Sequence, residues 1–203
     1  MPVKLDLVRL NKAEYVAPRS PVLVTVKPAR YLTIAGRGDP NGPAFAEAMG
    51  ALYAMAFTIK MAKKAAGRDY KVAPPEGQWW GAGKGQLLID TPPSSWRWKL
   101  MMRLPTFVAA RDRAAAVRAL LAKGKVPIVR KVKVETLREG RCAQMLHVGP
   151  YREEHETIRR MMEFAREHRL VSRGKHHEIY LNDPRRVAPA KLRTILRVPV
   201  GAR

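Results

Sequence analysis

Cysteine is almost missing from this sequence, and long apolar runs are missing altogether. One cysteine, Cys142, among 203 residues excludes an internal disulfide framework and a cysteine-rich metal site. No apolar run approaches the roughly 18 residues of a membrane span, and the first residues lack the apolar core of a secretion signal. We therefore expect a cytoplasmic protein without a membrane partner.

Acidic residues are also scarce. The chain has 17 Asp and Glu against 39 Lys and Arg, a net charge of +22, and a pI of about 10.9. Such an excess suits phosphate-rich partners. The cations are spread over the whole chain, however, and no zinc-finger spacing, basic region or aromatic RNA-binding motif accompanies them. The charge predicts a solvated basic surface, and a nucleic-acid partner rests on charge alone.

Residue periodicity divides the first half of the chain into strands and one long helix. Apolar residues that recur every three or four positions from Phe45 to Ile59 indicate an amphipathic helix. The Gly- and Pro-rich segment 36–43 is expected to be a turn, and the segment 82–95 a loop. The expected strands cover 22–26, 30–36, the segment that carries Trp79 and Trp80, and 96–105, and the helix covers 43–64.

The second half repeats this order of elements. Residues 102–105, Met-Arg-Leu-Pro, end the first half, and residues 196–199, Leu-Arg-Val-Pro, correspond to them in the second. An alanine-rich helix over 111–123, ended by Gly124, joins the halves. The other expected elements are a strand over 126–137, its hairpin partner over 142–148, a helix over 153–169 and strands over 175–181 and 192–199.

This repetition predicts an α+β fold built by duplication. Two ββαββ-like modules of the SHS2 type would form a pseudo-two-fold pair with a mainly antiparallel sheet, helices on one side and a central cleft. Clefts between such units commonly bind ligands. We expect one domain over 1–203, with an N-terminal arm at 1–20, a first repeat at 21–107, a linking helix at 108–125 and a second repeat at 126–203.

The strand at 175–181 carries the most distinctive polar pattern. Alternate side chains of a strand share a face, so His176, Glu178 and Tyr180 would lie together, while Ile179 and Leu181 enter the core. Such a trio can face a ligand, although a surface glutamate can also simply pair with one of the many cations here. By the same alternation Trp79 and Trp80 point to opposite faces, one into the core and one toward a surface or pocket, unless both fill core.

Four stretches together resemble a known family. They are residues 51–58, 70–80, 145–151 and 176–186. In them the chain resembles the GyrI-like small-molecule-binding superfamily, and within it the stand-alone branch that is similar to cyclopropanoid cyclopropyl hydrolases. Those enzymes open the strained cyclopropane of DNA-alkylating natural products. Other members of the superfamily bind flat, often cationic drugs.

The resemblance implies a site. Glu178 matches the position of a glutamate on the late strand, and the pocket aromatics would be Trp79, Trp80, Tyr151 and Tyr180. Glu178 would act as a general base on a water molecule, and Tyr151 or Tyr180 would donate a hydrogen bond to the water or to the substrate carbonyl. The remaining ligand-binding candidates are His176, Tyr53 and His147.

Two other functions remain open on the sequence. A non-catalytic drug-binding protein would use the same pocket without activating water, and a gyrase-binding or nucleic-acid-binding protein would use the basic charge. No cofactor is expected. No metal is expected either, because no HExxH motif is present and His176 and His177 point to opposite faces of the strand. Cys142 sits in an apolar strand and is expected to be inert core rather than a nucleophile.

Overall fold

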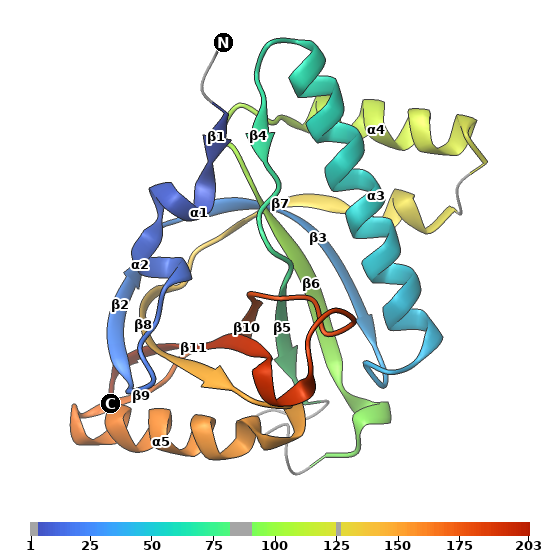
Figure 1. Ribbon diagram of the computed structural model, residues 1–203. Coiled ribbons are helices and arrows are strands. Elements are labelled where there is room, and N and C mark those ends of the chain that lie inside the picture. Colours follow the sequence, from blue (N-terminus) through green and yellow to red (C-terminus); the bar gives the residue numbers. More distant parts are fainter. Residues whose placement is uncertain (1–3, 82–90, 125–126) are drawn as a thin grey trace.

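The computed structural model describes residues 4–81, 91–124 and 127–203 and has a mixed α+β fold (Figure 1). The strands of its large sheet are β2 (Val22–Val26), β3 (Ala29–Arg37), β5 (Glu76–Trp80), β6 (Arg97–Leu104), β7 (Lys133–Leu137), β8 (Gly140–Val148), β9 (Leu170–Ser172), β10 (His176–Tyr180) and β11 (Arg193–Ala202). The long helices are α3 (Pro43–Ala65), α4 (Ala110–Ala122) and α5 (Glu154–Glu167). The N-terminal arm forms β1 (Leu5–Asp6), α1 (Leu7–Leu10) and α2 (Lys12–Tyr15), and β1 pairs in parallel with β4 (Tyr70–Lys71).

The sheet order joins the two halves of the chain more closely than their sequence order suggests. The order is β2-β8-β11-β10-β5-β6-β3-β7, with β9 paired to β11, and all these pairs are antiparallel. Strand β2 therefore lies beside β8 of the second half, and β7 lies beside β3 of the first. Read from either edge, the sheet presents equivalent strands of the two halves in the same order, as a duplication would produce. The exception to a simple side-by-side arrangement is that β2, the first strand of the first half, pairs within the second half, and β7, the first strand of the second half, pairs within the first.

One expected pairing is wrong. Residues 126–137 and 142–148 do not form a hairpin, because β7 pairs with β3 and β8 pairs with β2 and β11. Residues Pro127–Lys131 form a short 3-10 helix instead of the start of a strand. Pro127 has no backbone N–H to give to a ladder, and β7 is further held to the first half because Glu135 accepts hydrogen bonds from Thr33 and Lys99.

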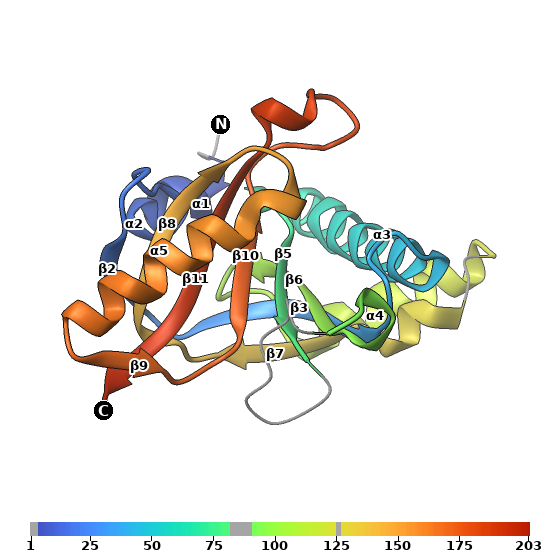
Figure 2. The same ribbon diagram turned by 90° about the horizontal axis from the view of Figure 1, so that it is seen from below.

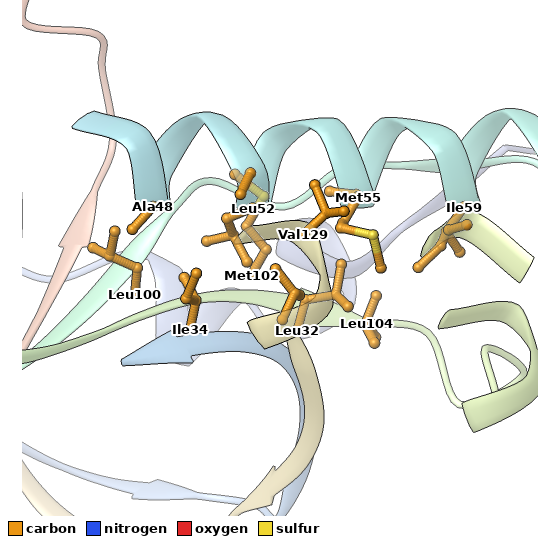
Figure 3. Packing of buried hydrophobic residues seen from close by; sticks show 14 of the residues in the cluster. Leu32, Ile34, Ala48, Leu52, Met55, Ile59, Leu100, Met102, Leu104 and Val129 are labelled. Atoms are coloured by element: carbon orange, nitrogen blue, oxygen red, sulfur yellow. The ribbon is translucent and has the colours of Figure 1, made fainter. Parts of the chain in front are cut away.

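The two long helices α3 and α5 cover the same face of the sheet. Alternate residues of β3 and β6 pack against α3, as Figure 3 shows for Ile34, Leu100 and Leu52. In the second half, residues of β8 and β11 pack in the same way against α5. Residues paired across antiparallel strands point to one face, and one such row crosses the sheet through Ile34, Leu100, Gly77, Glu178, Leu196 and Met145.

Glu178 thus stands where the two apolar cores meet. Figure 2 shows its strand, β10, running beside β5 between α5 and α3. The row of paired residues is apolar on both sides and changes to Gly77 and Glu178 only at its centre. Apolar core packing alone does not explain a carboxylate at such a position.

The arm and the opposite face of the sheet share a buried network of charges. His177 contacts Glu76 and Glu139 at 3.0 Å each, Tyr15 of α2 donates to Glu76 at 2.7 Å, and Arg197 contacts Glu139 at 3.5 Å. Arg103, at the position of the first repeat that corresponds to Arg197, pairs with Glu14 of the arm. The arm is therefore attached by buried polar contacts as well as by apolar packing.

A membrane-spanning helix was not expected. Within residues 4–81, 91–124 and 127–203, no helix combines the length and hydropathy that crossing a membrane requires.

Candidate functional site

The site begins with the alternation of side chains on β10. His176, Glu178 and Tyr180 face the helices, whereas His177 and Ile179 are fully buried on the other face. Strand β5 places Trp79 opposite His176 and Gly77 opposite Glu178. The paired strands therefore bring Glu178, Tyr180, His176 and Trp79 onto one face between α3 and α5.

A chain of hydrogen bonds orients the Glu178 carboxylate. Tyr180 Oη donates to Glu178 Oε2 at 2.8 Å, and Trp79 Nε1 donates to Tyr180 Oη at 3.0 Å. His176 Nε2 lies 3.1 Å from the other carboxylate oxygen, Oε1. Burial, and then the nearby negative charge of Glu178, raise the pKa of Tyr180 well above its usual value. Tyr180 therefore remains a phenol that donates to the carboxylate.

A second carboxyl group, from Glu154, completes the site. Glu154 is the first residue of α5 and is only 6% exposed. One of its oxygens lies within 4.8 Å of donor atoms of both Glu178 and His176. Burial and the charge of Glu178 raise the pKa of Glu154 well above its usual value. Glu154 therefore holds its proton to a higher pH than an exposed glutamate does, and Glu178 accepts the hydrogen bond from Tyr180.

From the sequence, Glu154 is expected only to belong to the helix over 153–169, and its place in the site is missed. Acidic residues are common at helix N-termini because they suit the helix dipole. Nothing in the local pattern distinguishes a glutamate that serves this purpose from one that turns inward toward a strand far along the chain.

Gly77 is a second residue that sequence analysis missed. A Cβ atom there would lie 2.8 Å from Tyr180 Oη and 2.9 Å from Trp79 Nε1. Only glycine therefore leaves room for the hydrogen bond that joins Trp79 to Tyr180. A signal was present, because glycine inside a strand often marks close approach of another group.

Aromatic rings surround this polar centre. Phe45 of α3 stacks on Trp79, with ring centroids 5.6 Å apart, and Trp96 meets Trp79 edge-on at 6.0 Å. Tyr151 meets Tyr180 edge-on at 5.9 Å. Tyr151 is 39% exposed, and burial, followed by the charges of Glu154 and Glu178, raises its pKa to about 12. It therefore presents a neutral phenol donor toward solvent at the edge of the site.

Trp80 lies apart from this centre, and among the described residues neither Tyr53 nor His147 makes a hydrogen bond or ring contact with it. Trp80 points to the opposite face of the sheet, where the Lys175 Nζ atom lies 3.4 Å from its ring centroid. The pairing of β5 with β10 places Trp79, and not Trp80, on the face of Glu178. Tyr53 of α3 is half-buried and stacks on Phe57 at 6.3 Å.

His147 occupies the same face of the sheet, but both of its ring nitrogens already have partners. Nδ1 lies 2.9 Å from Thr157 Oγ1 of α5, and Nε2 lies 3.3 Å from the carbonyl oxygen of Pro150. This side chain is buried and holds the start of α5, and with it Glu154, against β8.

Access to the carboxylate is limited. The side chains of His176 and Glu178 are 14% and 12% exposed. Much of the expected loop at 82–95 lies outside the described residues, which omit 82–90. The central cleft expected from the duplication therefore stays a prediction.

The chain is similar to a known family and to solved structures. The family described as GyrI-like small molecule binding domain matches residues 111–200. An uncharacterized conserved protein from Listeria innocua is similar over 98% of this chain and 100% of its own, at 38% identity and a TM-score of 0.90. A hydrolase encoded by lin2189 from Listeria innocua has the same coverage, 36% identity and a TM-score of 0.89.

More distant likeness concerns the fold alone. The C-terminal domain of EcmrR has a TM-score of 0.59 at 8% identity, over 91% of this chain and 98% of that domain. No curated protein matches the chain.

Proposed function

We propose a hydrolytic function for this chain, which belongs to the GyrI-like small-molecule-binding family. Its substrates would be planar, electrophilic small molecules that carry a cyclopropane ring, and opening that ring would detoxify them. The observation that carries the proposal is the oriented carboxylate of Glu178, held by Tyr180 and His176 beside the buried Glu154. The similarity to a hydrolase at 36% identity supports it.

Glu178 is the proposed general base. Its Oε2 atom accepts a hydrogen bond from Tyr180, and its Oε1 atom lies 3.1 Å from His176 Nε2, so the carboxylate is fixed in orientation before a substrate arrives. Positioned general bases contribute about 10²- to 10⁴-fold to a rate. Glu178 takes a proton from water while the water oxygen forms a bond to a methylene carbon of the cyclopropane. A carbon–carbon bond of the ring breaks as this new bond forms.

The electron pair of the broken bond moves to the conjugated carbonyl oxygen of the substrate. Tyr151 remains a phenol at neutral pH, because its pKa is about 12, and it would stabilise the developing negative charge with a hydrogen bond. Glu154 supplies the proton that this oxygen finally takes up, and Glu178 then returns the proton from water to Glu154. The sum is the addition of one water molecule.

The aromatic side chains suit a flat substrate. Trp79 is held between Phe45 and Trp96, and Tyr151 adjoins Tyr180, so rigid rings flank the polar centre on both sides. Offset and edge-on contacts with such rings add about 0.5–1.5 kcal/mol each to apolar burial.

The test is turnover of a cyclopropane-bearing duocarmycin-type compound, with the ring-opened product measured by chromatography. Glu178→Gln keeps the shape of the side chain but removes the base, and we expect product formation to fall by at least about 100-fold. Glu153→Gln is the matched control, because Glu153 is exposed and precedes Glu154. Undiminished turnover by Glu178→Gln would refute the assignment of the base.

Two tryptophan variants add a test of the aromatic site. Trp79→Ala should weaken substrate binding, whereas Trp80→Ala should leave it nearly unchanged because Trp80 faces the other side of the sheet. Equal effects of the two variants would contradict the proposed location of the substrate.

A non-catalytic function as a binder of planar organic cations is the second candidate. In the part of the chain that the structure describes, neither Glu154 nor Glu178 pairs with a lysine or arginine, so the two carboxyl groups are available to a cationic ligand. Tight binding of the test compound without product would favour this function over hydrolysis.

A further inference from the structure

Three side chains of the site present the donor atoms that a metal ion needs. Glu154 from the start of α5 and His176 and Glu178 from β10 each place one donor atom within 4.8 Å of the other two. His176 Nε2 and Glu178 Oε1 are 3.1 Å apart. Two ligands that are each about 2.0–2.1 Å from a zinc ion at a tetrahedral angle lie about 3.3 Å apart, so this pair is already spaced as ligands of one ion.

Two of these three side chains also carry a buried polar atom without a hydrogen-bond partner. Within the described residues, five buried side-chain polar atoms have no hydrogen-bond partner, and three of them are Glu154 Oε1, Thr194 Oγ1 and His176 Nδ1, the ring nitrogen that is not the one beside Glu178. Thr194 pairs with Tyr180 across β10 and β11 and shares its face. Glu154 is 94% buried, since only 6% of it is exposed. Buried polar atoms nearly always have a partner. Glu154 leaves Oε1 without one and places a carboxylate oxygen within 4.8 Å of donor atoms of His176 and Glu178, which indicates that a ligand is missing.

The local charge has the sign that a cation requires. The protein carries 39 Lys and Arg, yet among residues 4–81, 91–124 and 127–203 the only ion-pair contact of Glu154 or Glu178 is the one with His176. Other buried acidic residues here do have cationic partners, as Glu14 has Arg103 and Glu139 has Arg197. Neither Glu154 nor Glu178 has such a Lys or Arg partner among the described residues, although the chain is strongly basic.

We propose that Glu154, His176 and Glu178 together bind one divalent transition-metal ion. Two carboxylate oxygens and one imidazole nitrogen suit Zn²⁺, Co²⁺ and Mn²⁺, whereas Mg²⁺ prefers oxygen ligands alone. Affinity should follow the order Zn²⁺ above Co²⁺ above Mn²⁺. Three protein ligands leave at least one coordination position open. His177 does not take part, because it is fully buried on the other face between Glu76 and Glu139.

The test is metal binding measured in the absence of any substrate. The full-length protein is dialysed against EDTA and then into chelator-free buffer, and Zn²⁺ is titrated by calorimetry. We expect one ion per chain. Loss of an interaction that merely supports a metal ligand costs 10- to 100-fold in affinity, so Glu154→Gln and His176→Gln should each weaken binding by at least about 10-fold.

Matched controls separate this site from surface histidines and acids. Glu153→Gln and His155→Gln change exposed residues on either side of Glu154 in sequence, and both should bind Zn²⁺ as the unchanged protein does. Co²⁺ supplies a spectroscopic readout, because its visible absorption reports the coordination around the ion, and that band should be absent in Glu154→Gln. Circular dichroism of each variant establishes that it is folded before binding is compared.

Several results would overturn the proposal. One is an unchanged protein that binds Zn²⁺ no more tightly than Glu154→Gln and His176→Gln. Another is a loss of binding in His155→Gln, and a third is Mg²⁺ that binds as tightly as Zn²⁺. The hydrolase proposal uses Glu178 and Glu154 in the metal-free site, so its turnover assay is run with EDTA added, and the metal-binding result is obtained separately. Either proposal can therefore fail while the other stands.

Discussion

At the scale of single residues, the site depends on one glycine as much as on its acids. Gly77 lies directly opposite Glu178 in the β5–β10 pair. Its missing side chain is what lets Tyr180 Oη and Trp79 Nε1 approach each other to 3.0 Å. Tyr180 in turn donates to Glu178, so a methyl group at position 77 would act on the carboxylate through two other side chains.

We expect Gly77→Ala to lower both stability and turnover. Its Cβ would lie less than 3.0 Å from Tyr180 and Trp79, and overpacking of this kind costs about 1–3 kcal/mol of unfolding free energy. Urea unfolding measures that loss. The control is Gly50→Ala in α3, where an added Cβ meets nothing within 4 Å and where alanine should be neutral or stabilising by about 0.5–1 kcal/mol. Equal stability of the two variants would contradict the close packing at position 77.

At the scale of elements, the N-terminal arm is more than a loose covering. Its helix α2 places Tyr15 and Glu14 into the face of the sheet that α3 and α5 leave free. Tyr15 donates to Glu76, and Glu14 pairs with Arg103. The arm therefore supplies polar partners that the sheet alone lacks.

Tyr15→Phe should lower the free energy of unfolding by about 1.5–3 kcal/mol, because it removes a buried hydrogen bond to a charged group while keeping the ring. Tyr151→Phe is the control, since Tyr151 is 39% exposed and surface changes usually stay within about 0.5 kcal/mol. Chemical denaturation of both variants makes the comparison. A Tyr15 variant as stable as the Tyr151 variant would show that the arm is held by apolar contacts alone.

At the scale of the whole molecule, the buried network below the sheet should govern stability in acid. Burial alone would raise the pKa of Glu139. The charges of His177 and Arg197 outweigh burial and hold this pKa below its usual 4.5. Burial alone would lower the pKa of His177, but Glu139 and Glu76 outweigh it and raise that pKa to about 9. His177 is therefore cationic throughout the acid range, and Glu139 is the group that titrates.

A carboxyl group with a lowered folded-state pKa adds stability above its unfolded pKa and loses that contribution as pH falls through the folded value. Unfolding free energy should therefore fall as pH drops below about 4.5. Because the pKa of His177 is raised from 6.5 to about 9, unfolding free energy should also fall as pH rises from about 6.5 through 9. Glu139→Gln should be less stable at pH 7 by about 3–5 kcal/mol, because Arg197 and His177 lose a buried partner, and its loss of stability in acid should be shallower.

Urea unfolding from pH 7 to pH 3 measures both effects, with the exposed Glu167→Gln as the control. A Glu139 variant with the same acid dependence as the unchanged protein would assign the acid sensitivity to other groups.

The sequence by itself determined most of the local structure of this protein and the faces of its key strand. The periods of two and 3.6 residues are local properties, so the strands 22–26 and 30–36, the helix after Gly42 and the alternation of His176, Glu178 and Tyr180 could be predicted from them. Resemblance of short motifs added the family.

Only the tertiary structure decided how these parts meet. Pairing between strands far apart in the chain depends on their register and on which strand edges are available as partners. The local periodicity of the sequence contains neither. This pairing places β2 beside β8 of the second half and β7 beside β3 of the first. It also places Trp79, rather than Trp80, on the face of the sheet that carries Glu178. The tertiary structure also brought Glu154 from the start of α5 to a strand more than 20 residues later, because helix and strand approach through the packed core and not through the sequence between them.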